Sequence, residues 1–137
     1  MNFDYVVDNS VVTGWWHAGQ ATDYTRRLRD LIPNSRIHAP QLWTLEFANV
    51  LRKLRVTGRL TDADVGAVVA QVGAARIIIE PQVESAAEVL ERALRFDLSA
   101  YDAAYLGVAL RLRLPIACKN GALARAAETA GVGVFQP

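Results

Sequence analysis

The sequence has one cysteine, two histidines and almost no net charge, and each of these scarcities excludes a class of protein. Because Cys118 stands alone, no internal disulfide can stabilise the fold. His17 and His38 have neither the spacing nor the neighbours of a zinc-binding pair. Fifteen basic residues against fourteen acidic ones leave a formal net charge of +1, so no overall positive field attracts nucleic acid. A nucleic-acid surface would have to be a local patch.

Long apolar runs and phosphate-binding glycine loops are also missing. No apolar stretch approaches the roughly 18 residues that cross a bilayer, and the acidic N-terminus, with no Lys or Arg before Arg26, lacks the pattern of a secretory signal. The GxxxxGK[ST] motif of P-loop nucleotide sites is absent. With 137 residues and 52% hydrophobic content, the chain fits one domain over residues 1–137. We expect a soluble protein of the reducing cytoplasm that makes no membrane contact.

Short apolar runs alternate with longer segments of helical period along the chain. The runs predict five strands, at residues 3–8, 36–39, 76–80, 115–118 and 132–135. Strands that alternate with helices form parallel sheets, because parallel neighbours need crossover connections. The predicted fold class is therefore α/β: a single-domain three-layer sandwich with a central five-stranded parallel sheet.

Capping signals locate the ends of several intervening helices. Pro40 begins one of them, where its missing N–H costs nothing, and Gly58 ends it. Thr61 and Ser99 are each followed three residues later by an aspartate. This is the spacing of a capping box, in which two side chains satisfy each other's backbone N–H groups at the start of a helix.

Three acids lie where apolar residues are expected. In "YVVDNSVV", Asp8 ends the first strand, and ligands of parallel sheets bind beyond the carboxyl ends of the strands. In "PQLWTLEFANVLRK", Glu46 lies on the apolar face of a helix. In "LSAYDAAYLGVAL", the helical neighbours of Asp102 are also mostly apolar. Burying an unpaired carboxylate costs several kcal/mol, so each of these acids needs a partner.

Each acid has a structural interpretation beside a functional one. Asp8 could cap the helix after the strand, Glu46 could pair with an arginine, and Asp102 could be the acid of its capping box. If the three carboxylates instead meet, their mutual repulsion requires a cation. Oxygen ligands without a His or Cys cluster select a hard divalent ion, Mg²⁺ or Mn²⁺. Such an acidic, metal-loaded cleft can polarise a phosphodiester and activate water.

A basic run follows Glu46 along the same helix and the turn after it. The run consists of Arg52, Lys53, Arg55 and Arg59, which could hold the phosphates of a substrate. The alternative is an ordinary solvated helix face, and the sequence leaves both interpretations open.

Three segments together resemble the PIN-domain family, in particular its VapC-type ribonuclease toxins. They are "YVVDNSVV", "APQLWTLEFANVLRKL" and "LSAYDAAYLGVALRLRLPIACKNGALARAAETAGV". The resemblance implies a sheet of order 3-2-1-4-5, Mg²⁺-dependent endoribonuclease activity, a homodimer and a cognate VapB-type antitoxin. The family's first three acids match Asp8, Glu46 and Asp102, with Asp8 and Asp102 as the principal metal ligands and Glu46 acting on the attacking water. The polar residue two positions after the first acid matches Ser10.

The fourth acid of that family is missing here. The family usually has Thr-x-Asp after the fourth strand, where this chain has "ACKNGAL", which aligns Cys118 with the threonine and Asn120 with the aspartate. An asparagine keeps an oxygen ligand but loses the charge, which should weaken a second metal site most. Asp97, in the loop before Ser99, is a candidate replacement. Alternatively, Asn120 is the N-cap of the helix that follows.

The sequence is compatible with three alternative functions. The first is a metal-dependent endoribonuclease, the toxin of a type II toxin-antitoxin pair. The second is a catalytically weakened PIN-fold binding module, because Asn120 replaces the fourth acid. The third is a receiver-type phosphoacceptor domain, which needs an acid pair after the first strand and an aspartate after the third; this chain has Asp8 followed by Asn9, and Glu80 followed by Pro81.

Overall fold

A parallel four-stranded sheet forms the centre of the molecule in the computed structural model, which describes residues 2–137. The strand order is β3-β2-β1-β4, and every neighbouring pair is parallel. Val6 of β1 lies opposite His38 of β2 and Ile116 of β4. The strands are β1 (Phe3–Val7), β2 (Ser35–Ala39), β3 (Ile78–Ile79) and β4 (Ile116–Ala117).

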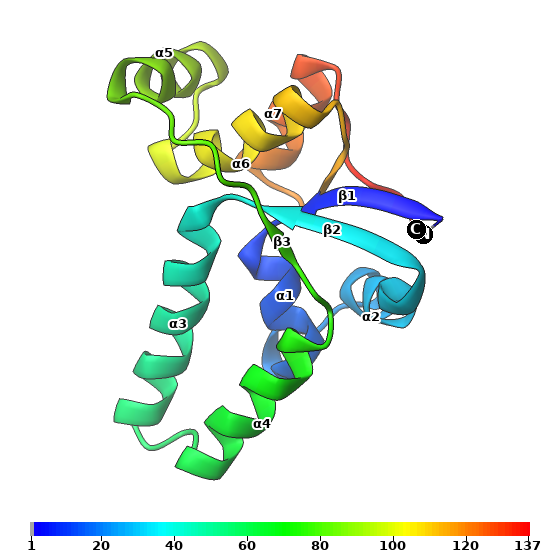
Figure 1. Ribbon diagram of the computed structural model, residues 1–137, viewed down its shortest axis with the longest axis vertical. Helices are drawn as coiled ribbons and strands as arrows, with labels where there is room; N and C mark the ends of the chain where they lie inside the picture. Colours follow the sequence, from blue (N-terminus) through cyan, green and yellow to red (C-terminus); the bar gives the residue numbers. More distant parts are fainter. Residues whose placement is uncertain (1) are drawn as a thin grey trace.

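Helices cover both faces of this sheet (Figure 1). In that view α1 to α4 lie below the sheet and α5, α6 and α7 lie above it. The helices are α1 (Asn9–Trp16), α2 (Asp23–Leu31), α3 (Gln41–Val56), α4 (Asp62–Gly73), α5 (Ala86–Phe96), α6 (Ala100–Leu112) and α7 (Ala122–Ala130), with two short 3₁₀ turns, η1 (Ala18–Gln20) and η2 (Ile32–Asn34). The predicted α/β sandwich with a parallel sheet is confirmed.

The fifth predicted strand, at residues 132–135, is reduced to one bridge between Ile116 and Val134. The Ile116 N–H donates to the Gly133 carbonyl, and the Phe135 N–H donates back to the Ile116 carbonyl. Gly131 and Gly133 have φ values of 85° and 77°, in the left-handed region that extended strands do not use. The chain therefore pairs with β4 only from Gly133 to Phe135, which is too short to form a strand.

The strand order also decides between two of the functional interpretations. A receiver-type domain has the flavodoxin-like order 2-1-3-4-5, which places the third strand beside the first. Here β1 lies between β2 and β4. The receiver interpretation is therefore wrong.

Local signals located most helix boundaries correctly. Pro40 immediately precedes α3, and Gly58 follows its end with a φ of 75°. Thr61 begins α4 with a complete capping box, since its hydroxyl accepts the N–H of Asp64 and the Asp64 carboxylate accepts the N–H of Thr61. Within residues 2–137, no helix is both long and apolar enough to cross a membrane.

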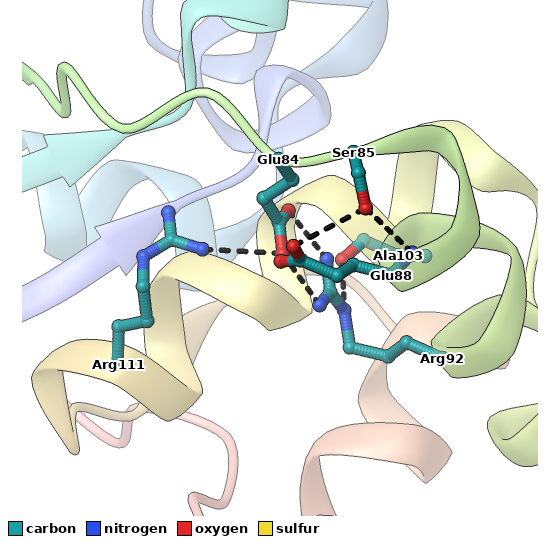
Figure 2. A network of polar contacts seen from close by, with 6 residues as sticks. All are labelled: Glu84, Ser85, Glu88, Arg92, Ala103 and Arg111. Atoms are coloured by element: carbon teal, nitrogen blue, oxygen red, sulfur yellow. Dashed lines mark hydrogen bonds and ion pairs between the residues drawn. The ribbon is translucent and has the colours of Figure 1, made fainter.

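A buried ion network joins α5 to α6 (Figure 2). Arg92 of α5 makes a two-pronged contact with Glu84, with Nη1 2.7 Å from Oε2, and both side chains are less than 15% exposed. Arg92 Nε also donates to the Ala103 carbonyl of α6 at 2.7 Å. Arg111 reaches the same Glu84 carboxylate at 3.3 Å from the far end of α6. The network fixes the turn of α6 that carries Asp102.

Candidate functional site

Asp8 lies where β1 ends and α1 begins. Its backbone N–H donates to the Ala117 carbonyl of β4 at 3.0 Å, which extends the sheet by one hydrogen bond. The Ser10 hydroxyl donates to Asp8 Oδ2 at 2.6 Å. Burial raises the pKa of Asp8, the Ser10 hydrogen bond opposes this, and the charge of Asp102 raises the pKa further. Ser10 thus contacts the acid that it was predicted to support.

The capping interpretation of Asp8 is half right. The residue has the extended backbone of an N-cap, and its carbonyl accepts the N–H groups of Val11 and Val12. Its side chain, however, makes no capping hydrogen bond, although the N–H groups of Asn9 and Ser10 lower its pKa. The Asp8 carboxylate therefore does not cap α1.

Glu46 lies in the second turn of α3, and its side chain is partly buried. Its partner is a tyrosine from another helix, since the Tyr105 hydroxyl of α6 donates to Glu46 Oε1. Burial raises the pKa of Glu46, the Tyr105 hydrogen bond lowers it, and the charges of Asp8 and Asp102 raise it again. The arginine partner proposed from the sequence is therefore wrong.

Asp102 is the third residue of α6, and its capping box is incomplete. The Ser99 hydroxyl accepts the Asp102 N–H at 3.1 Å, as the spacing predicts. Among residues 2–137, no donor contacts the Asp102 carboxylate, in contrast to Asp64, whose carboxylate accepts the Thr61 N–H. Burial raises the pKa of Asp102. Ser99 alone caps the helix, and the Asp102 carboxylate stays available.

The structure brings these three acids into electrostatic contact from three separate elements. The charge of Asp102 acts on Asp8, and both charges act on Glu46. No ion pair with Lys, Arg or His is made by any of the three within the part of the chain that the structure describes. Burial is the main cause of the raised pKa of each acid, and repulsion between the carboxylates adds to it for Asp8 and Glu46.

The three acids offer a divalent ion oxygen ligands only. In residues 2–137, no three His, Cys, Asp or Glu side chains are grouped closely enough to hold one ion as they stand. Asp8 and Asp102 nevertheless offer carboxylate oxygens without a cationic partner, and hard ions such as Mg²⁺ take oxygen ligands and usually keep several waters. The chemistry of the residues fits such an ion, with water completing its coordination.

Cys118 directly follows β4, the strand that pairs with β1. The thiol is buried, and burial, with added effects of the charges on Asp8 and Asp102, raises its pKa to about 12. The group therefore remains a neutral thiol at physiological pH. Its neutrality also means that it supplies no fourth negative charge in place of the missing acid.

Asn120 lies exposed in the loop between β4 and α7. It borders two adjoining cavities, of about 460 and 390 Å³, which also share Val134 and Gln136. The N-cap of α7 is Gly121, so the interpretation of Asn120 as the helix cap is wrong. Its oxygen has no capping role that would compete with a ligand.

Asp97 does not take the place of the fourth acid in this structure. It ends α5 in the left-handed conformation, with a φ of 54°. It borders a different cavity, of about 260 Å³, with Phe96 and Arg125. Asp97 is not among the charges that raise the pKa of Asp8 or Glu46.

The basic run on α3 lies apart from the acids. Arg52 and Lys53 are exposed, and they begin six residues beyond Glu46, about 9 Å further along the helix. Arg55 is paired with Asp62 at the start of α4. The far end of α3 extends away from the sheet (Figure 1), so these cations could contact only a substrate that follows the helix.

Tyr105 is the site residue that the sequence reading missed. It lies three residues after Asp102 on the same face of α6. A polar hydroxyl one turn after a candidate ligand was the available signal. What the sequence did not contain was its contact with Glu46, which comes from a helix distant in the chain.

Comparisons with known proteins agree with this fold. A family model described as the PIN domain matches residues 5–129. The crystal structure of PAE2754 from Pyrobaculum aerophilum superposes with a TM-score of 0.62, covers 92% of this chain and 86% of that chain, and shares 22% of its residues. At this identity the likeness concerns the fold alone. No curated protein matches the sequence significantly. Because the family model spans most of its length, the chain belongs to the PIN domain family.

Proposed function

We propose that this PIN domain is a metal-dependent endoribonuclease. PIN domains are generally metal-dependent nucleases. The proposal rests on the set of Asp8, Glu46 and Asp102, none of which has a cationic partner among residues 2–137. Burial raises the pKa of all three carboxyls, the charge of Asp102 raises that of Asp8 further, and both aspartates raise that of Glu46. Uncompensated charge of this kind is characteristic of functional sites rather than of structural ion pairs.

In this proposal each residue has a distinct role. Asp8 and Asp102 would hold Mg²⁺, or Mn²⁺ in its place, and the ion supplies charge stabilisation of the phosphodiester when bound. Ser10 restrains the Asp8 carboxylate through its hydrogen bond. Glu46 accepts the proton of the attacking water through the oxygen that Tyr105 leaves free, and its raised pKa brings its basicity closer to that of a working general base.

The finer assignment, also proposed, is that of a toxin in a type II toxin-antitoxin pair. Its support is the resemblance of the three motif segments to VapC-type ribonuclease toxins. The assignment includes an RNA substrate, a VapB-type antitoxin, a homodimer and a cytoplasmic location. Exposed apolar side chains give a partner something to bind: Leu90 and Leu94 on α5 and Tyr101 on α6 are each more than half exposed. A short DNA-binding antitoxin encoded beside this chain would support the assignment.

The test is a cleavage assay on a labelled structured RNA with EDTA, MgCl₂ or MnCl₂. We expect cleavage only with a divalent ion, its loss in Asp8→Asn and Asp102→Asn, and a strongly reduced but measurable rate in Glu46→Gln. Glu91→Gln, which neutralises an exposed carboxylate on α5, is the matched control and should cleave normally. Cleavage that persists in EDTA, or that survives all three substitutions, would contradict the proposal.

A second candidate function is RNA binding without efficient cleavage. Asn120 in place of the fourth acid favours it, as does the absence, within the described residues, of three acids already grouped around one ion position. RNA binding by the unmodified chain with no cleavage in either metal would favour this binding module over the nuclease.

A further inference from the structure

The contact between Tyr105 and Glu46 joins two helices at the candidate site. Tyr105 belongs to α6 and Glu46 to α3, and the phenol donates its hydrogen bond to Oε1 of the carboxylate. We propose that Tyr105 is a positioning residue that holds the Glu46 carboxylate in the orientation needed to accept a proton from the attacking water. This inference rests on the proposed nuclease function.

The two partners differ in how firmly the protein holds them. The Tyr105 side chain is 1% exposed and belongs to the main hydrophobic core. Glu46 is partly exposed and has the rotational freedom of a long side chain. A rigid donor that contacts a flexible acceptor restricts the acceptor, so the hydrogen bond selects one arrangement of Glu46 at the site.

The Tyr105 hydroxyl keeps its donor proton throughout the working pH range. Burial raises its pKa strongly, and the carboxylates of Glu46 and Asp8 raise it further. The phenol has a single O–H group, and it donates this group to Glu46 Oε1, so Tyr105 is the donor and Glu46 the acceptor. The second carboxylate oxygen, Oε2, is the one left to meet a water.

The position of Tyr105 also relates Glu46 to Asp102. The tyrosine follows Asp102 by three residues on α6, which places the two side chains on neighbouring turns of one face. Arg92 holds this part of α6 through the Ala103 carbonyl. One rigid helix therefore carries a proposed ligand acid and the support of the proposed proton acceptor.

The test is a double-substitution cycle with Tyr105→Phe and Glu46→Gln, each alone and both together. Rates are measured on a fluorescein-labelled RNA hairpin with saturating MgCl₂. We expect Tyr105→Phe to lower kcat by about tenfold or more with KM unchanged, because a misplaced catalytic group loses rate rather than binding. In the Glu46→Gln background the same substitution should change kcat by less than about twofold, since its effect passes through Glu46.

Two further readouts separate positioning from general damage. Tyr5→Phe removes the hydroxyl of another fully buried tyrosine, on β1 and stacked against Phe135, and should leave kcat unchanged. The rise in melting temperature caused by MgCl₂ should be the same in Tyr105→Phe as in the unmodified chain, because Asp8 and Asp102 remain. A second cycle by urea unfolding, with Tyr105→Phe and Glu46→Ala, removes the acceptor oxygen that glutamine would keep, and it should give a nonzero coupling between Tyr105 and Glu46.

The outcomes are decisive in each direction. An equal loss of kcat in both backgrounds, an unchanged kcat, or zero coupling in urea would overturn the inference. If the unmodified chain cleaves no RNA, the proposed function fails, and the urea coupling still decides whether Tyr105 holds Glu46.

Discussion

Gly107 of α6 lies directly against the guanidinium of Arg92. A β-carbon built at position 107 would lie 2.4 Å from Arg92 Nη2 and 2.9 Å from Glu84 Oε1, so the ends of both side chains would have to move. The glycine is therefore a condition for the ion network between α5 and α6, and through it for the placement of Asp102.

The first prediction is that Gly107→Ala destabilises the protein by about 2–4 kcal/mol, because it displaces a buried ion pair without replacing it. Gly66→Ala is the matched control, since Gly66 also lies within a helix and has no atom within 4 Å of its built β-carbon. That substitution should stabilise α4 by about 0.5–1 kcal/mol. Urea unfolding of both variants measures the difference, and equal effects would mean that Arg92 moves aside freely.

The second prediction concerns charge repulsion without metal. The folded-state pKa of Asp8 is raised, so its contribution to stability is fully present below the unfolded pKa of about 3.9 and is lost as the pH rises through the folded value. In EDTA, Asp8→Asn should therefore melt at the same temperature as the unmodified chain near pH 4 and higher near pH 7. It should also lose the stabilisation given by Mg²⁺.

Melting curves across this pH range, with EDTA and with MgCl₂, provide the measurement. Ser10→Ala is the companion variant, because it removes the hydrogen bond that lowers the pKa of Asp8 while keeping the charge. It should melt lower than the unmodified chain at neutral pH. A lower melting temperature for Asp8→Asn at pH 7 in EDTA would instead make the carboxylate a structural group.

The third prediction is that Asn120→Asp increases Mg²⁺ or Mn²⁺ affinity and RNA cleavage. A carboxylate binds a divalent cation more tightly than an amide does. The gain in rate should be roughly tenfold if about 1.4 kcal/mol of transition-state stabilisation is regained. Titration calorimetry gives the affinity, and kinetics at saturating metal separate ion occupancy from an effect on the water. Unchanged affinity and unchanged rate would show that position 120 is not a ligand position.

The fourth prediction is that the double substitution Arg52→Ala/Lys53→Ala raises KM for RNA a few-fold and leaves kcat unchanged, because these exposed cations lie along α3 beyond the acids. Loss of two phosphate contacts should also reduce the slope of binding against salt concentration by about 2. Arg27→Ala, an exposed cation on α2, is the control. RNA-binding assays at several salt concentrations measure this slope. If the double variant and the unmodified chain have identical slopes, Arg52 and Lys53 belong to an ordinary solvated face.

The sequence predicted those features that depend on local pattern. Helical spacing placed Glu46 and Asp102 away from the fully solvated faces, and the strand-end position placed Asp8 at the carboxyl edge of the sheet, where the structure has them. Their metal-binding roles stay predictions. Local pattern succeeded here because a side chain's face depends only on the period of its own element.

The missed features depend on backbone conformation or on contacts between distant segments. The run 76–80 predicted a five-residue strand, whereas β3 has only Ile78 and Ile79, because Arg76 adopts a left-handed conformation with a φ of 52°. The residue types in "ARIIIE" do not distinguish a five-residue strand from a two-residue strand. The Tyr105 contact with Glu46 and the network of Arg92 were likewise invisible, since each partner comes from another element.

The parallel arrangement of the sheet affects when the three acids come together during folding. Asp8, Glu46 and Asp102 lie on separate elements far apart in the chain, so no local hairpin or single helix brings any two of them together during folding. Contacts between segments far apart in the chain form slowly, because each requires the closure of a long loop. The acids therefore assemble only when β4 and α6 have docked on β1. A partly folded chain carries all three residues without their arrangement, so under the proposed function its capacity to bind a divalent ion depends on these long-range contacts.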